Sequence, residues 1–160
     1  MGLTADICDD FKEEVVLADP LFIPFGKNVS FYGPVHTVKV FEDNVLVKQA
    51  LESLPEGSVL VVDGGGSERC ALMGDNLAAI AEERNLAGVI LNACIRDSRE
   101  INEMPVGIHA LGTNPFKSIK KGEGSSDITL RFANAEWRPG MWAYADEDGI
   151  LLAEEKLSLK

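Results

Sequence analysis

The sequence Gly74-Asp75-Asn76-Leu77 stands where a helix is expected to begin. The first backbone N–H groups of a helix have no partner inside the helix, and the helix dipole adds partial positive charge at that end. Asp75, Asn76 and Leu77 would therefore present N–H groups that can hold a carboxylate or a phosphate. The segment predicts an anion-binding site.

Arg96 and Asp97 follow directly after a second apolar stretch. The planar guanidinium of Arg96 can hold a carboxylate through two hydrogen bonds. Asp97 and Asp75 supply the hard oxygen ligands that Mg²⁺ or Mn²⁺ prefers. An Arg-Asp pair at a strand end often forms only a surface ion pair or a cap, so the pair alone leaves a structural role open. The functional alternative is an acidic substrate activated by a divalent metal cation.

Two apolar stretches with a helical pattern between them would position these groups. Residues 58–63 and 88–93 are typical of strands buried on both faces, and residues 74–85 have the spacing of a helix. A strand, a helix and a strand within about thirty residues form a βαβ unit with parallel strands. Ligands gather where such strands end and the next helices begin.

The other expected elements complete one domain. A helix capped by Thr4 is expected over residues 4–11, and a helix capped by Asn44 over residues 45–54. Short strands are expected over residues 34–41, 106–111, 128–132, 141–145 and 150–153. The sequence therefore predicts a single domain over residues 1–160 of the α/β class, with a central parallel βαβ unit and antiparallel C-terminal strands.

Composition excludes several classes of function. The chain has 160 residues, of which 46% are hydrophobic and 26% charged, as in an ordinary globular domain. Its net charge of −11 argues against direct binding of nucleic acid, which depends on Lys and Arg. No apolar run approaches the roughly 18 residues that cross a membrane, and the first residues lack a signal-peptide pattern. We expect a cytoplasmic protein without a membrane partner.

Two cofactor classes are also disfavoured. Cys8, Cys70 and Cys94 are odd in number and lack CxxC spacing, so neither a disulfide framework nor a zinc site is indicated. The glycine-rich loop at residues 64–66 does not complete the dinucleotide fingerprint G-x-G-x-x-G, because Arg69 stands where its last glycine would be.

Residues 61–67, 71–78 and 88–97 resemble the RraA-like family, and the resemblance covers nearly the whole chain. That family contains regulators of ribonuclease E activity and the 4-hydroxy-4-methyl-2-oxoglutarate / 4-carboxy-4-hydroxy-2-oxoadipate aldolases. The aldolases carry an aspartate, twenty intervening residues and then Arg-Asp. Asp75 and the pair at residues 96–97 satisfy that spacing.

The resemblance implies a role for each residue. Arg96 and the backbone N–H groups of residues 74–77 would bind a small 2-oxo acid. Asp97 would hold the divalent cation, Mg²⁺ or Mn²⁺. Asp75 would orient a water that accepts the proton of the substrate hydroxyl. The implied activity is a class II aldolase that also decarboxylates oxaloacetate, with a pyruvate enolate as the common intermediate.

The resemblance also implies a swivelling β/β/α-type fold and a homotrimer, or a multiple of it, with sites between subunits. A Schiff-base route would need a buried lysine, and Lys39 alone among the nine lysines lies inside a clear strand. The alternative function is a non-catalytic regulator that binds and inhibits ribonuclease E, because the segment at residues 41–44 is closer to those regulators. The presence of both Asp75 and Asp97 favours the enzyme.

Overall fold

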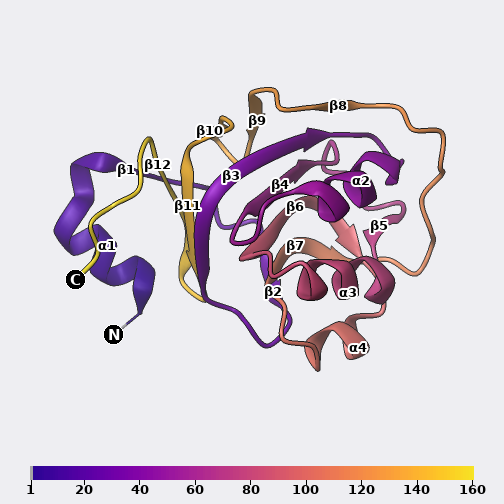
Figure 1. The fold of residues 1–160 in the computed structure, drawn as a ribbon, viewed down its shortest axis with the longest axis horizontal. Coiled ribbons are helices and arrows are strands. Elements are labelled where there is room, and N and C mark those ends of the chain that lie inside the picture. Colours follow the sequence, from indigo (N-terminus) through magenta and orange to yellow (C-terminus); the bar gives the residue numbers. More distant parts are fainter. Residues whose placement is uncertain (1) are drawn as a thin grey trace.

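The computed structural model describes residues 2–160, and one twisted sheet of ten strands organises it (Figure 1). Its strands follow the order β1-β12-β11-β3-β4-β6-β7-β2. The four central strands are parallel to one another. They are β3 (Phe31–Lys39), β4 (Val59–Asp63), β6 (Gly88–Ile95) and β7 (Ile108–Thr113).

Antiparallel strands extend this parallel centre on both sides. On one side they are β11 (Trp142–Asp146), β12 (Gly149–Ala153) and β1 (Val15–Leu17), and on the other side β2 (Ile23–Phe25). Two short strands pair off this path, β5 (Ala71–Met73) with β6 and β8 (Ser125–Ser126) with β3. A separate hairpin is formed by β9 (Leu130–Phe132) and β10 (Ala135–Trp137).

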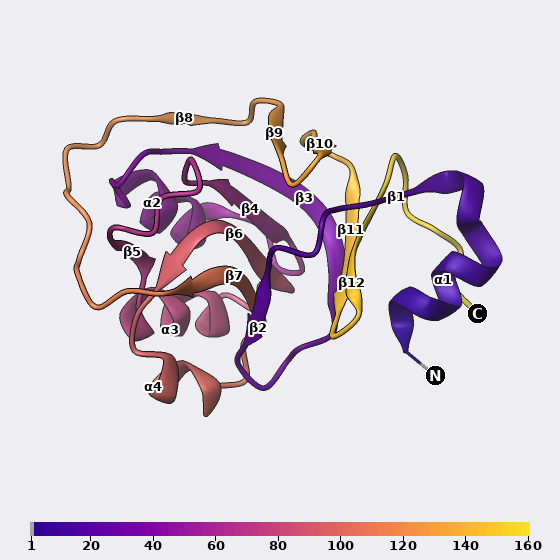
Figure 2. The same cartoon turned by 180° about the vertical axis from the view of Figure 1, so that it is seen from behind.

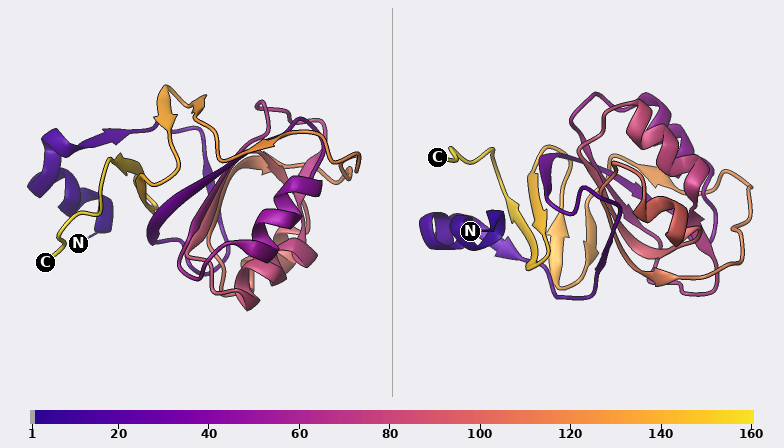
Figure 3. Two further views of the ribbon diagram at one scale, coloured as in Figure 1. Left: turned by 45° about the horizontal axis from the view of Figure 1, so that its top comes forward. Right: turned by 90° about the horizontal axis from the view of Figure 1, so that it is seen from below.

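Three helices cover one face of the parallel strands (Figures 1 and 3). They are α2 (Val45–Ser53), α3 (Asp75–Glu83) and α4 (Ser98–Asn102), and each connects one parallel strand to its neighbour. Such crossovers are almost always right-handed, so strands that pair in chain order place their helices on the same face. Within residues 2–160, no helix combines the length and the apolar character needed to cross a membrane.

Helix α1 (Leu3–Phe11) lies apart from the other helices, beside β11 and β12 and near both ends of the chain (Figure 2). The 3₁₀ turn η1 (Lys12–Glu14) then leads into β1. Ile7 of α1 is buried against Tyr144 and Leu151 of the two strands. This contact covers one face of β11 and β12.

The parallel strands separate two hydrophobic cores. Val62 and Leu91 face the helices, while Val61 and Ile90 face the hairpin and β11, and all four are 0% exposed. Trp137, also 0% exposed, fills the second core and donates its indole N–H to the carbonyl of Phe132. Because both faces are covered, these strands are continuously apolar, as their sequence predicts. The α/β class, the βαβ unit and the antiparallel C-terminal strands are confirmed.

The predicted cap at Thr4 is wrong, whereas Asn44 occupies the predicted N-cap position of α2 without a side-chain capping bond. Thr4 lies inside α1, and its hydroxyl donates to Asp146 Oδ1 over 2.6 Å. The Asn44 side chain makes no capping bond to α2, and the carboxylate of Asp43 accepts the N–H of Val45 instead. In both places a long-range partner competes with the local bond and orients the side chain away from the cap.

Asp146 should stabilise the fold as a buried carboxylate. It is 4% exposed and accepts bonds from the N–H and hydroxyl of Thr4 and from the N–H of Asp148. Burial by itself raises the pKa of Asp146, but these hydrogen bonds outweigh it, and the pKa lies below its ordinary value. We expect Asp146→Asn to lower the free energy of unfolding by about 2–4 kcal/mol at pH 7.

The pH dependence follows from the sign of that shift. A carboxylate whose folded pKa is depressed contributes stability above its unfolded pKa, and this is lost as the pH falls toward the folded value. Urea unfolding at pH 7 and near pH 3 measures this contribution. The difference in the free energy of unfolding between the wild type and Asp146→Asn should be smaller at the lower pH. An unchanged difference would contradict the role of the charge.

Candidate active site

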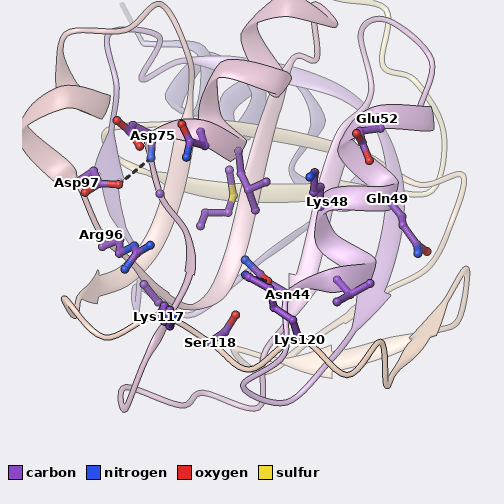
Figure 4. Close-up of a pocket in the computed structure, with 16 residues that line it drawn as sticks. Asn44, Lys48, Gln49, Glu52, Asp75, Arg96, Asp97, Lys117, Ser118 and Lys120 are labelled. Carbon is purple, nitrogen blue, oxygen red and sulfur yellow. Dashed lines mark hydrogen bonds between the residues drawn. The ribbon is translucent and has the colours of Figure 1, made fainter.

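A pocket of about 570 Å³ lies where the parallel strands end, between the first turns of α2 and α3 (Figure 4). This size suits a small organic ligand. Most of its polar lining comes from the ends of β5 and β6, from α2 and from the segment after β7. The lining residues are Asn44, Val45, Lys48, Gln49, Glu52, Ala71, Met73, Gly74, Asp75, Asn76, Leu77, Arg96, Asp97, Lys117, Ser118 and Lys120.

Parallel pairing of β5 with β6 brings the two predicted segments together. Met73 and Ile95 are register partners, and the N–H of Arg96 donates to the carbonyl of Met73 over 2.9 Å. The residues that follow each strand, Asp75 and Asp97, therefore leave the sheet side by side. The interval between them in the sequence holds α3 and the return along β6.

Asp97 is turned toward the N-terminus of α3. Its Oδ2 accepts the N–H of Asp75 over 3.1 Å, as drawn in Figure 4. Its backbone has a left-handed φ of +58°, which Asp tolerates better than most residues, and its side chain does not cap the following helix α4. The N–H of Leu77 makes no hydrogen bond to any group of residues 2–160, so one donor of the helix end remains for a ligand.

The carboxyl groups of Asp75 and Asp97 influence each other. Burial raises the pKa of Asp75, and the hydrogen bond and negative charge of Asp97 raise it further, with a smaller contribution from Glu100. Two facing carboxylates resist a second negative charge, and a divalent cation between them would remove that cost. The donor set therefore fits a hard cation.

A cation held here would take few protein ligands. Within residues 2–160, no group of three or more His, Cys, Asp or Glu side chains converges. Mg²⁺ in proteins is often bound through one or two carboxylates and keeps several waters. A site with Asp97 as its carboxylate ligand and with bound waters beside Asp75 is consistent with that kind of binding.

Arg96 is free to bind an anion. It is half-buried at the edge of the pocket, and its Nη1 lies 3.5 Å from the carbonyl of Pro115, at the limit of a hydrogen bond. Among the described residues, no carboxylate lies within 4.0 Å of its guanidinium. Two-point binding of a substrate carboxylate therefore displaces no internal ion pair.

All six residues singled out in the sequence line this one pocket, and their chemical roles remain predictions. The sequence reasoning missed its other polar residues, which come from α2 and from the segment after β7. A cluster of lysines at residues 117–121 was the available signal, but it is equally typical of a solvated loop. The missed polar residues are Asn44, Lys48, Gln49, Glu52, Lys117, Ser118 and Lys120.

Gly74 should be needed for the position of Asp97. A Cβ at Gly74 would lie 2.5 Å from Asp97 Oδ2, while the backbone there is extended and accepts any residue. We expect Gly74→Ala to lower activity at least tenfold, because the carboxylate must move away from the N–H of Asp75, with little change in stability. Steady-state kinetics beside thermal unfolding measures both, and full activity in a normally folded variant would refute the requirement.

Comparison with known proteins identifies the family of this chain. Residues 4–152 match the family model RraA-like, described as Aldolase/RraA. A protein of Bacillus cereus, provisionally named a 4-hydroxy-4-methyl-2-oxoglutarate aldolase, is 53% identical over 157 residues, with 98% of this chain and 99% of the relative covered. An Arabidopsis thaliana protein with the same provisional name, numbered 3, is 47% identical, with 98% of this chain and 97% of the relative covered.

Solved structures give the same relationship. A Geobacillus kaustophilus protein, described as an S-adenosylmethionine:2-dimethylmenaquinone methyltransferase, has a TM-score of 0.97 at 53% identity, with 99% of each chain covered. The RNA-processing inhibitor RraA from Thermus thermophilus has a TM-score of 0.93 at 44% identity, with 99% of this chain and 96% of that chain covered. The resemblance seen in the sequence is thereby confirmed: this chain belongs to the RraA-like (Aldolase/RraA) family.

Proposed function

We propose that this protein is a divalent-metal-dependent lyase that cleaves 4-hydroxy-4-methyl-2-oxoglutarate and related 4-hydroxy-2-oxo acids. The observation that carries the proposal is the convergence of three groups on one pocket. These are the N-terminus of α3, the unpaired guanidinium of Arg96 and the facing carboxyls of Asp75 and Asp97. Relatives that share about half of their residues with this chain carry the corresponding name.

The reaction breaks the bond between C3 and C4 of the substrate. A base takes the proton of the C4 hydroxyl, C4 becomes a ketone, and the bonding electrons move to C3 as an enolate that is then protonated. From 4-hydroxy-4-methyl-2-oxoglutarate both products are pyruvate. The enzyme must therefore bind a 2-oxo carboxylate, stabilise an enolate oxygen and accept one proton.

The residues divide these tasks in the proposal. Arg96 binds the C1 carboxylate and the 2-oxo oxygen, and the free N–H of Leu77 donates to the same end of the substrate. Asp75 orients the water that accepts the hydroxyl proton. Asp97 would hold the divalent cation. When bound, the cation supplies a Lewis acid for the negative charge at the 2-oxo oxygen.

Pyruvate release measured in a coupled assay tests the proposal. Oxaloacetate loses carbon dioxide through the same enolate and needs no hydroxyl base, so it should be a second substrate. We expect both reactions to require Mg²⁺ or Mn²⁺ and to stop when a chelator is added. Activity that persists unchanged in chelator would reject the metal-dependent mechanism.

The proposal includes a homotrimer, or a multiple of it, in the cytoplasm. The edge strands β1 and β2 and the loop between them expose apolar side chains, which supports an interface there. Light scattering at low concentration measures the assembly, and an active monomer would contradict a site shared between subunits. The exposed residues are Val16, Leu17, Leu21 and Ile23, between 49% and 61% exposed.

Regulation of ribonuclease E is the second candidate, because an RraA protein is 44% identical to this chain. The segment at residues 41–44 supports it less than its sequence suggested. Glu42 forms an ion pair with Arg69, and Asp43 is buried and accepts backbone N–H groups, so neither acid is free for a basic partner. A pull-down with ribonuclease E, using both the wild type and Asp97→Ala, separates this role from catalysis.

A further inference from the structure

Ser118 carries a hydroxyl that has no partner. The residue is 6% exposed, and within residues 2–160 its Oγ is the one buried side-chain oxygen or nitrogen without a hydrogen bond. Buried polar groups are nearly always paired, so an exception in a native fold calls for an explanation. Ser118 lines the pocket described above, and in Figure 4 its hydroxyl points toward the interior.

Backbone contacts on both sides hold Ser118 in this position. The N–H of Ala71 donates to the carbonyl of Phe116 over 2.8 Å, and the N–H of Ile119 donates to the carbonyl of Glu42 over 2.9 Å. Its neighbours in the sequence, Lys117 and Ile119, have exposed side chains, which change rotamer quickly. A ligand in the pocket can therefore reach the hydroxyl although it is shielded from bulk water.

Uncompensated positive charge surrounds this part of the pocket. Lys48, Lys117 and Lys120 line it, and among the described residues none of them has a carboxylate within 4.0 Å. Glu52 is the one acid that α2 adds to the lining. The whole chain carries 26 acidic and 15 basic residues, so this local excess of cations runs against the general charge and would attract an anion.

Lys120 is also oriented by a neutral partner. Its Nζ donates to Asn44 Oδ1 over 3.0 Å, and Asn44 Nδ2 donates to the carbonyl of Leu72 over 3.0 Å. The amide positions the ammonium group without cancelling its charge. In Figure 4, Ser118 and Lys120 lie along the lower edge of the pocket and Lys48 lies higher on α2, whereas Asp97 and Arg96 lie at the left of the view.

We propose that Ser118, with Lys48 and Lys120, forms a second anion subsite that binds the distal carboxylate of a dicarboxylic 2-oxo acid. This rests on the proposed function, in which Arg96 and the N-terminus of α3 hold the 2-oxo acid end. The C5 carboxylate then accepts a bond from the hydroxyl and meets the lysines. A 2-oxo acid with a methyl group in place of the C5 carboxylate leaves the hydroxyl of Ser118 unpaired. A site of this kind strongly favours the ligand that carries the carboxylate.

Calorimetric titration with two ligands of equal chain length tests the subsite. The probes are 2-oxoglutarate and 2-oxopentanoate, added with Mg²⁺ to the wild type and to Ser118→Ala. We expect the wild type to bind 2-oxoglutarate at least tenfold more tightly. Ser118→Ala should weaken that binding by about tenfold, the usual worth of a hydrogen bond to a charged group, and change 2-oxopentanoate binding less than twofold.

Stability gives an independent readout. Because Ser118→Ala removes an unpaired buried hydroxyl, its Tm without ligand should rise by about 2–4 °C, whereas a structural serine would lower it. Ser126→Ala, at an exposed position of β8, is the matched control and should change neither the binding of 2-oxoglutarate nor the Tm. Lys120→Met should weaken 2-oxoglutarate binding, while Lys121→Met, exposed and outside the pocket lining, should not.

Two results would overturn the subsite. One is a wild type that binds the two ligands equally, and the other is a Ser118→Ala protein that loses both ligands in the same proportion. Failure of the lyase proposal is recognised separately. In that case the wild type would show no aldol cleavage but would still bind 2-oxoglutarate more tightly than 2-oxopentanoate.

Discussion

Replacing Asp75 with asparagine should lower the aldol cleavage rate by about two to four powers of ten. The proposed task of this carboxylate is to orient the water that accepts the proton of the C4 hydroxyl. Decarboxylation of oxaloacetate passes through the same enolate but has no hydroxyl proton to remove, so its rate should fall much less. The ratio of the two rates in one variant is the quantity to measure.

The ratio also separates this role from the alternatives. Equal losses in the two reactions would show that Asp75 serves the cation or the fold, since both are needed for each reaction. Glu100→Gln is the matched control, because Glu100 is exposed and acts on Asp75 only through its charge. It should change either rate only slightly. Thermal unfolding of Asp75→Asn must remain close to that of the wild type for the comparison to hold.

Arg96→Lys should lower kcat/KM by about two to three powers of ten in both reactions. Lysine keeps the positive charge but loses the planar two-point contact with a carboxylate and the neighbouring 2-oxo oxygen. The guanidinium has no internal ion pair among the described residues, so the fold should not depend on it. Steady-state kinetics with 4-hydroxy-4-methyl-2-oxoglutarate and with oxaloacetate measures the effect.

Arg99→Lys provides the control for this change. Arg99 is exposed on α4 and does not line the pocket, so the same substitution there should leave both reactions unchanged. An Arg96→Lys enzyme with nearly full activity would show that a single positive charge is sufficient. The assignment of the substrate carboxylate to Arg96 would then be wrong.

The sequence by itself determined the central part of the fold. The apolar runs that became β4 and β6, with the helical spacing between them, predict a parallel βαβ unit because strands covered on both faces need no polar side. The strands that were predicted lie within a few residues of the observed ones, although β6 continues to Ile95 and β3 begins at Phe31. The short strands β1, β2, β8 and β10 were not predicted. The resemblance of residues 61–67, 71–78 and 88–97 identified the family, which the comparisons confirm.

Local patterns failed where a partner distant in the sequence competes for the same side chain. Thr4 and Asn44 have the side chains of helix caps, yet one bonds Asp146 and the other bonds Leu72 and Lys120. The short strand β5 was also missed, because three residues carry no period of their own. Its pairing with β6 is nevertheless what sets Gly74 and Asp75 beside Asp97.

Only the tertiary structure decided how the pocket is completed. Lys48 comes from α2, and Ser118 and Lys120 from the segment after β7, far from Asp75 and Arg96 in the chain. Nothing in the spacing of these residues relates them, because their proximity depends on the order of the parallel strands and on two backbone bonds that hold the segment beside β5 and the loop before α2. The unpaired hydroxyl of Ser118 is likewise a property of its surroundings, since a serine in a polar loop is ordinarily solvated.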